Sequence, residues 1–280
     1  RVLLSDQFSD KEKLISSNLD SYASWTTALV GSAWIEVKDN SAVGTEAYPA
    51  GTYAGFVMRE VDLISLGTTL TVTKYLGDQE QESMNFSSLV GLLGSSKSQV
   101  GFVTSEPFDR VRLSINAGLA VGTFTARVYY AEILKPCTPE PLVCNEMTAL
   151  VQGDGTNTGH SVVIEPERTG FTGVNLGDLV NPMNIVNADT DDYASLIMPV
   201  GLLATGSVSV RDIGETYTAG HFAGFEISNT NLLSIDLLNS VTIETYLNGD
   251  FQENSGNNLS LLDVPLIDSN QRNVVGFITT

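Results

Sequence analysis

Apolar and polar side chains alternate along most of this chain, which is the pattern of β-strands that bury one face. Residues 35–38 alternate apolar and charged side chains, and residues 208–211 alternate apolar and polar side chains in the same way. Further strands, rich in Val, Ile, Thr, Tyr and Phe, are predicted at 53–59, 69–76, 99–104, 110–115 and 123–133. No segment longer than about 12 residues combines a helical apolar stripe with helix caps, so we expect helices to be short or absent.

One ten-residue segment occurs twice. Residues 48–57 read YPAGTYAGFV and residues 217–226 read YTAGHFAGFE, with six identical positions. Other landmarks recur in the same order 171 residues later: 22–24 at 193–195, and 75–76 at 246–247. A repeat of this length indicates two copies of one structural unit.

The expected fold is all-β, built from tandem antiparallel sandwiches. About eight strands per copy, separated by turn residues, favour the jelly roll. An immunoglobulin-like sandwich is the alternative, although each copy is longer than that fold needs and lacks its Cys and Trp pattern. We expect one sandwich at 1–134, a linker at 135–145 and a second sandwich at 146–280 that lacks its last strands, because its sequence stops after the counterpart of 99–104.

The glycines of the repeated segment are better explained by packing than by phosphate binding. Gly51 and Gly220 precede a predicted strand, and Gly55 and Gly224 lie at its start. Glycine there permits a positive φ or the close approach of a neighbouring backbone. A phosphate-binding loop needs a following helix, whereas a strand pattern follows here, so nucleotide binding is excluded.

Charge and composition limit the partners. The chain has 33 Asp and Glu against 14 Lys and Arg, a formal net charge of -19. This charge repels nucleic acid and anionic lipid headgroups. A hydrophobic content of 42 % supports packed cores. No apolar run reaches about 18 residues, so we expect no membrane insertion. The chain starts without a charged-then-apolar leader, and we expect any signal peptide to lie outside it.

The two cysteines, Cys137 and Cys144, lie in the proline-rich segment KPCTPEPLVCN between the copies. We expect them to form a disulfide that stiffens the linker and adds about 2 kcal/mol of stability, in an oxidising compartment. A zinc site is the rival interpretation. Zinc takes four ligands, however, and the only histidines, His160 and His221, are isolated in sequence. His160 lies in a stretch rich in Gly, Thr and Asn, where we expect it to be exposed.

Catalysis has little support in the sequence. A nucleophile needs a nearby base, usually histidine, and the first copy has Thr52 where the second has His221. A carboxylate pair for glycoside hydrolysis depends on a spatial separation that the sequence does not give. We therefore expect no enzyme activity.

Calcium is one candidate ligand. An acidic turn at 187–192 precedes Tyr193, and its counterpart in the first copy precedes Tyr22. Carboxylate oxygens are the ligands that calcium prefers. The candidate ligands are Asp189, Asp191 and Asp192 in the second copy, with Asp20 and Glu132 in the first. The alternative is an ordinary Asx turn, in which Asp and Asn side chains cap backbone amides.

Tryptophan occurs only in the first copy. Trp25 aligns with Leu196, so we expect it in the core. Trp34 has the opposite parity to Ile35 and is predicted to face outward. An exposed indole can stack on a sugar ring or dock a neighbouring unit.

Several segments together resemble a known repeat type: DYAS, SVSVRD, YTAGHFAGFEI, ETYLNGDFQE, VGFITT, PFDRVRL, ARVYYAEI and the linker CTPEPLVCN. They look like the repeat modules of very large cell-surface proteins of Bacteroidota, which include gliding-motility adhesins exported by the type IX pathway. The resemblance implies an extracellular stalk at the cell surface. Its partners would be neighbouring repeats, surface polysaccharide, and motility or export components.

The sequence thus favours a structural spacer that also attaches to surfaces or polysaccharide, without catalysis. A carbohydrate-binding module of a secreted protein is the alternative. A subunit of the export or motility machinery that displays the array is a third possibility.

Overall fold

The computed structural model describes most of the chain. The described residues are 2–4, 8–27, 31–39, 47–62, 69–86, 96–117, 124–138, 141–153, 159–173, 177–198, 204–228, 241–256, 259–262 and 272–280. Their regular elements are antiparallel β-strands and three short 3₁₀ helices, as the alternation predicts. Contacts divide the chain into two compact units, Arg1–Glu215 and Thr216–Thr280, and each is described by itself.

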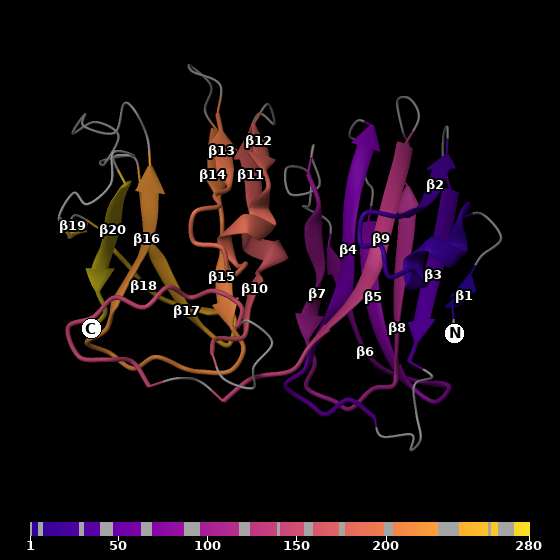
Figure 1. Cartoon of the computed structure of the whole chain (residues 1–280), viewed down its shortest axis with the longest axis horizontal. Helices are drawn as coiled ribbons and strands as arrows, with labels where there is room; N and C mark the ends of the chain where they lie inside the picture. The colour runs from indigo at the N-terminus through magenta and orange to yellow at the C-terminus, as the bar shows by residue number, and fades with distance from the viewer. Residues whose placement is uncertain are drawn as a thin grey trace. The chain divides into compact units, whose positions relative to one another are not determined.

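Nine strands and one 3₁₀ helix form a sandwich at the start of the first unit (Figure 1). They are β1 (Val2–Leu4), η1 (Lys11–Ile15), β2 (Ala23–Thr27), β3 (Gly31–Lys38), β4 (Tyr53–Asp62), β5 (Thr69–Leu76), β6 (Gln79–Phe86), β7 (Ser98–Val103), β8 (Arg110–Ala117) and β9 (Phe124–Leu134). The two sheets have the orders β1-β3-β8-β5-β6 and β2-β9-β4-β7.

The strand order identifies this sandwich as a jelly roll. Strands β2 to β9 contribute four strands to each sheet, and the chain crosses between the sheets six times, after every strand except β5. Two Greek keys folded in this way make an eight-stranded jelly roll, to which β1 adds an edge strand. The predicted jelly-roll fold is confirmed for this part of the chain.

The core of the sandwich follows the predicted alternation. Ile35 and Leu113 from one sheet and Phe56 from the other are fully buried in a single hydrophobic cluster. Trp25 belongs to the same cluster, as its alignment with Leu196 predicts. Burial of one face of each strand removes these apolar side chains from water, which is the main force that holds the sheets together.

Shorter strands follow in the rest of the first unit. They are β10 (Val162–Ile164), η2 (Pro166–Arg168), β11 (Gly170–Gly173), β12 (Asp178–Val180), η3 (Pro182–Ile185), β13 (Ser195–Ile197), β14 (Ala204–Ser207) and β15 (Val210–Asp212). They pair as β10 with β15, β11 with β14 and β12 with β13. Because the first unit extends to Glu215, the predicted division into sandwiches at 1–134 and 146–280 stays a prediction.

The second unit contains β16 (Phe222–Ser228), β17 (Glu244–Leu247), β18 (Asp250–Asn254), β19 (Ser260–Leu262) and β20 (Arg272–Ile278). Strands β16, β20 and β19 form one sheet, and β17 pairs with β18. In the first sandwich β8 joins β3 to β5 and β9 joins β2 to β4. The described residues of the second repeat hold no strand that corresponds to β8 or β9.

The repeat is visible in the pairing of strands. Gly55 lies opposite Gly101 between β4 and β7, and Gly224 lies opposite Gly276 between β16 and β20. A Cβ at Gly101 would lie 2.6 Å from the Ala54 carbonyl oxygen and from the Gly55 Cα. Each pair therefore needs glycine because the two backbones approach too closely for a side chain.

The glycine before each strand has a different reason. Gly51 has φ 84° and Gly220 has φ 90°, in the region that side chains disfavour. Their amides donate to Thr104 and Thr279 over 2.8 Å in both cases. The packing interpretation of the repeated segment is confirmed.

The linker differs from the prediction. Cys137 and Cys144 are free thiols, so the expected disulfide is not formed. The Cys137 amide donates to Ser161 Oγ over 2.6 Å, while Cys144 is exposed in a turn. Cys137 is thus held against the residues that lead into β10 instead of against its expected partner. No helix among the described residues is long and apolar enough to cross a membrane.

A lysine is buried inside the first sandwich. Lys74 is 0 % exposed, and its Nζ donates to the Phe102 carbonyl oxygen over 2.5 Å and lies 3.6 Å from the Phe102 ring centroid. Burial lowers the pKa of Lys74 from 10.5 to about 7, with Glu82 acting weakly in the opposite direction. Burial of the charged form is therefore unfavourable.

Gly101→Ala is expected to destabilise the protein by about 1–3 kcal/mol, because the added Cβ overpacks the strand pair. Gly77→Ala is the control, since Gly77 has a positive φ, unlike Gly101, but has open space around it. Gly77→Ala should lower the free energy of unfolding by roughly 1 kcal/mol, the cost of a side chain in the left-handed region of φ. Urea denaturation measures both. Equal effects would show that the close approach is not the constraint.

Lys74 should also make stability depend on pH. Above pH 7 the folded Lys74 loses its proton while the unfolded side chain keeps it up to about pH 10. Stability should therefore rise with pH in this window, by at most about 1.4 kcal/mol per pH unit. Lys74→Met should lose this rise in denaturation curves measured from pH 6 to 10. Parallel pH profiles of the two proteins would contradict the assignment.

Candidate functional site

Two arginines lie side by side on the outer face of the four-stranded sheet. Arg59 on β4 is paired directly with Arg127 on β9. Their neighbours along each strand, Met58 and Val128, are fully buried in the core. Because side chains alternate along a strand, both arginines point away from the core.

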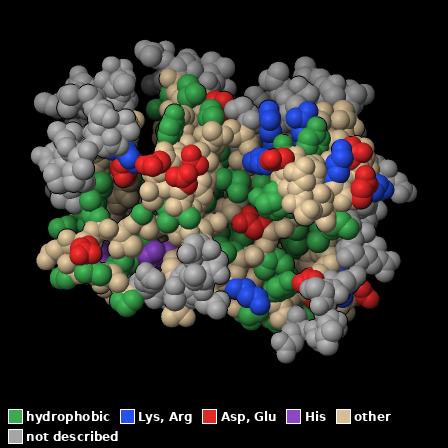
Figure 2. Space-filling view, in the orientation of Figure 1, with side chains coloured by type: hydrophobic (Ala, Val, Ile, Leu, Met, Phe, Trp, Pro, Cys, Tyr) green, Lys and Arg blue, Asp and Glu red, His purple; other side chains and the backbone are tan. Residues whose placement is uncertain are grey.

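Lys97 extends this pair across the sheet. Met58 pairs with Ser98 on β7, so Lys97, the residue before Ser98, is the next neighbour of Arg59 in the antiparallel register. We call Arg127, Arg59 and Lys97 the cationic row. All three are partly exposed. Figure 2 shows Lys and Arg side chains gathered over the upper ends of β4 and β9, as these strands appear in Figure 1.

Two tyrosines flank the cationic row. The Arg127 guanidinium lies 4.8 Å from the Tyr22 ring centroid, and Lys97 Nζ lies 4.4 Å from that of Tyr129. The two rings meet edge to face with centroids 5.5 Å apart. Cation–π contacts of this kind orient both the cations and the rings.

A β-bulge places Tyr129. On β9 the pairing with β4 passes from Tyr130 to Val128 between Val57 and Met58, which leaves Tyr129 as the extra residue. A bulge of this kind re-aims a side chain and is common beside binding sites. Tyr22 directly precedes β2, whose first residue, Ala23, is buried in the core.

The charges of the row are only partly balanced. Lys97 Nζ forms an ion pair with Asp20 at 2.5 Å. Neither Arg59 nor Arg127 forms an ion pair with a described carboxylate, and the buried Arg59 Nε has no described hydrogen-bond partner. Like charges directly opposite each other on a sheet are destabilising. In a chain of net charge -19, this arrangement favours an external anion.

The predicted tryptophan lies on the other sheet. Trp34 is partly exposed between the buried Ala33 and Ile35, so it faces outward from β3. The Arg112 guanidinium lies 4.6 Å from the Trp34 ring, and Arg112 is also paired with Glu36 at 2.7 Å. Both the indole and the arginine thus already have partners in the protein. The ligand-binding role of Trp34 stays a prediction.

The predicted calcium ligands of the first copy have other contacts. Asp20 is paired with Lys97. Glu132 accepts hydrogen bonds from Gln99 Nε2 at 2.8 and 2.9 Å. Burial raises the pKa of Glu132, and the Gln99 hydrogen bond lowers it in part. Gln99 Oε1 also accepts the Ile164 amide over 3.1 Å, so Glu132 takes part in a hydrogen-bonded link between β9, β7 and β10.

The acidic turn of the second copy is formed by its own hydrogen bonds. The Asp189 amide donates to Asn187 Oδ1 over 2.9 Å, and the Asp191 amide donates to Asp189 Oδ1 over 3.0 Å. In the first copy the Asp20 amide donates to Asn18 Oδ1 in the same way. Asp189, Asp191 and Asp192 are exposed. Among the residues that the structure describes, these carboxylates do not form a converging group of three, and the Asx turn explains their positions.

A shallow hollow of about 450 Å³ opens beside Tyr48 and Asp39. The Tyr48 hydroxyl donates to Asp39 Oδ2 over 2.7 Å. Burial, and after it the hydrogen bond to Asp39 and the charge of Asp39, raise the pKa of Tyr48 to about 12. Lys38 and Asp109, which also line the hollow, pair with each other at 2.7 Å. Its charges are balanced internally, so it attracts an ionic ligand less than the cationic row does.

Sequence reasoning missed the cationic row because its members are far apart in the chain. A signal was present for Arg127, which has the opposite parity to the apolar Ala126 and Val128. His160 was also wrongly expected to be exposed. It is 6 % exposed, with Nδ1 2.9 Å from Asp212 Oδ2.

The chain matches no protein-family model and no curated protein. Among solved structures it is similar to TmCBM61 in complex with beta-1,4-galactotriose, with TM-score 0.31 and 8 % identity over 48 % of this chain and 87 % of that chain. It is also similar to a pectin binding carbohydrate binding module, with TM-score 0.30 and 12 % identity over 48 % and 88 % of the two chains. Scores this low do not identify a ligand, so the site is interpreted from its own residues.

Sulfate should stabilise the protein through the cationic row. A divalent anion between Arg59 and Arg127 relieves their repulsion, so the melting temperature should rise more in sodium sulfate than in sodium chloride of equal ionic strength. The double variant Arg59→Gln, Arg127→Gln should lose about 2 °C of this difference. The double variant should still gain the general stabilisation that sulfate gives to any folded protein, because sulfate ions are excluded from the protein surface. An unchanged difference in the double variant would show that the arginines bind no anion.

Proposed function

We propose that this chain is a non-catalytic, extracellular binding region that attaches to an acidic polysaccharide through the cationic row of its first sandwich. The observation that carries the proposal is the direct pairing of Arg59 with Arg127 without a described carboxylate partner. Tyr22, which is partly exposed, supplies an aromatic surface of the kind that sugars use, and the buried Tyr129 supports it edge to face.

The chemistry of the row suits a carboxylated or sulfated sugar. A guanidinium group has a planar set of donors that matches a carboxylate or sulfate in two parallel hydrogen bonds. The face of a tyrosine ring packs against the C–H groups of a pyranose, while its hydroxyl stays in water. Two arginines and a lysine in a row can contact successive acidic groups along one polymer.

Other anionic polymers fit less well. Nucleic acid carries one phosphate charge per about 1.7 Å of duplex, so the rest of the chain, whose net charge is -19, repels it more strongly than a polymer with more widely spaced acidic groups. A polysaccharide can bind to a basic surface that covers only a short length of one sheet. The partly exposed cationic row is such a surface.

The row is a property of the first copy. In the second copy Ser228 takes the place of Arg59 and pairs with Arg272, the counterpart of Lys97. Arg272 Nε lies 3.2 Å from Glu226 Oε1. We therefore infer that the repeated units share the strand pairing, and that the first has acquired the binding surface.

The repeat supports the wider role. Two copies with the same glycine pairing suit an array that spans a distance, since neighbouring units of such arrays act as spacers. We propose that the chain belongs to a large cell-surface adhesin of the Bacteroidota type, in which this surface supplies attachment. Neighbouring repeats would be its partners within the polypeptide.

Calorimetry with an oligouronate tests the binding function. The chain should bind the oligouronate and not a neutral glucan of equal length, and the affinity should fall as salt is added. Arg127→Gln should weaken binding about tenfold or more, because a charge-assisted hydrogen-bonded pair is worth about 1.5–3 kcal/mol. Tyr22→Ala should weaken binding to a smaller extent.

Two variants serve as controls. Arg211→Gln removes a cation that is paired with Glu165 at 3.7 Å outside the row, and should leave binding unchanged. Trp34→Ala alters the opposite sheet and should also have no effect. Equal binding of the neutral glucan, or loss of binding in Trp34→Ala but not in Arg127→Gln, would refute the proposal.

A further inference from the structure

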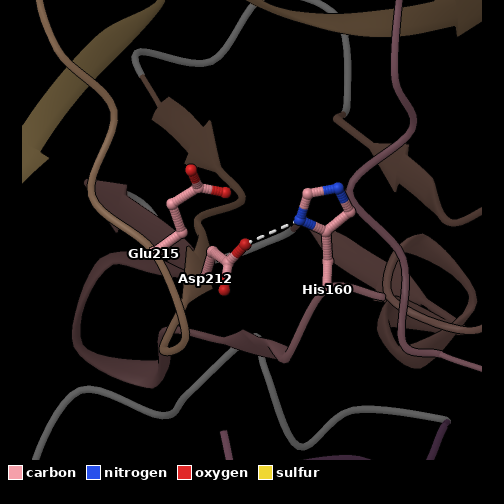
Figure 3. A group of neighbouring side chains, drawn as sticks. All are labelled: His160, Asp212 and Glu215. Atoms are coloured by element: carbon pink, nitrogen blue, oxygen red, sulfur yellow. Dashed lines mark hydrogen bonds and ion pairs between the residues drawn. The ribbon is translucent and has the colours of Figure 1, made fainter. Parts of the chain in front are cut away.

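Three side chains that are distant in sequence converge in the first unit. His160, Asp212 and Glu215 each offer a donor atom, and these atoms lie within 4.8 Å of one another (Figure 3). The cluster is unrelated to the cationic row, and its residues come from the segment that follows the first sandwich.

Strand pairing brings the three residues together. Val162 on β10 pairs with Asp212 at the end of β15, and His160 lies two residues before Val162. The Gly214 amide donates to Asp212 Oδ1 over 2.8 Å. This bond forms a tight turn after β15, and Glu215 follows the turn directly. The backbone therefore fixes all three side chains at one end of the β10–β15 pair.

The cluster is buried, unlike the acidic turn at 187–192. The side chain of Asp212 is 3 % exposed and that of His160 is 6 % exposed. Glu215 is partly exposed, but its Oε2 atom is buried and has no hydrogen-bond partner among the described residues. A buried carboxylate oxygen without a donor is costly, because it has lost its water without a replacement.

Charge points to a cation as the missing partner. Two carboxylates face one imidazole, so the group is negative whether or not the histidine is protonated. The nearest basic residue on the strand, Arg211, is directed to Glu165 instead. A divalent cation would neutralise both carboxylates at once in a region of low dielectric constant, where such a contact is strong.

We propose that His160, Asp212 and Glu215 bind a divalent transition-metal ion of the zinc class, with water completing the coordination. Zinc accepts imidazole nitrogen and carboxylate oxygen at about 2.0–2.2 Å. His160 Nδ1 and Asp212 Oδ2 are 2.9 Å apart, so both fit around one ion that takes the place of the proton between them. Calcium and magnesium prefer oxygen ligands alone, and the histidine selects against them.

The proposed ion would have a structural role. It would join the residue that leads into β10 to the end of β15 and to the turn beyond it. The short β10–β15 pair contains only three residue pairs, and a metal cross-link would hold it without a disulfide. Metal binding of this kind adds to folding stability, because the unfolded chain lacks the site.

The test uses the full chain, freed of metal by a chelator and titrated with Co²⁺ and then with Zn²⁺. We expect one Co²⁺ per chain with visible d–d absorption bands, displacement by Zn²⁺, and a higher melting temperature with either ion. Glu215→Gln keeps the shape of the side chain and should weaken zinc binding about tenfold or more. His160→Gln should abolish the cobalt spectrum. Ca²⁺ should give no heat in calorimetry that depends on these residues.

Matched controls separate the site from incidental binding. His221→Gln removes the other histidine, and the pair Asp189→Asn, Asp191→Asn alters the exposed acidic turn. Both should bind Zn²⁺ as the unaltered chain does. The metal-free Glu215→Gln protein should melt at the temperature of the metal-free parent, which shows that the fold is intact. Absence of stoichiometric binding, or binding that survives both Glu215→Gln and His160→Gln, would overturn the proposal.

Discussion

The pairing of β9 with β2 and β4 is the interaction on which the first sandwich and its candidate site depend. β9 lies between these two strands in the four-stranded sheet, so its hydrogen bonds join an early strand to a middle one. The same register sets Arg127 beside Arg59 and Glu132 opposite Gly55. A shift of one residue would turn every side chain of β9 to the opposite face. Core packing through Ala126 and Val128 therefore also fixes the basic surface outside.

Comparison of the two copies separates the features that both need for strand pairing from the features that only the first copy has. The opposed glycines occur in both, because close backbone approach between the paired strands allows no side chain. Lys74 and Arg59 are found in the first copy alone, with Thr245 and Ser228 at the corresponding positions of the second. The shared features maintain strand pairing. The features that differ carry burial costs or charge repulsion, which proteins retain where they serve a function.

The sequence predicts the strands well because a single repeating pattern determines them. Residues 69–76 coincide with β5, and 110–115 fall within β8, since alternation of apolar residues reports directly on the buried face. The glycines of the repeated segment were predictable for a similar reason, because glycine stands at the same positions in both copies. The jelly roll followed from the number of strands and the frequency of turns.

The parts that were missed depend on contacts between distant segments. The expected disulfide is absent, and the Cys137 amide is bonded to Ser161, a contact that linker composition does not reveal. His160 lies in a polar stretch that looks exposed, yet pairing of β10 with β15 buries it beside Asp212. Arg59 and Arg127 become neighbours only once the strand order is known. Cross-strand register, and not local composition, creates both proposed sites.

The most direct test of the account is to locate a bound acidic sugar on the protein by nuclear magnetic resonance. An oligouronate would be added to chain labelled with ¹⁵N, and the arginine Nε signals would be followed with the backbone amides. The account predicts that the signals of Arg59 and Arg127 shift together with the amides around Tyr22 and Tyr129. Shifts that centre on Arg112 and Trp34 of the opposite sheet, with the Arg59 and Arg127 signals unmoved, would contradict it.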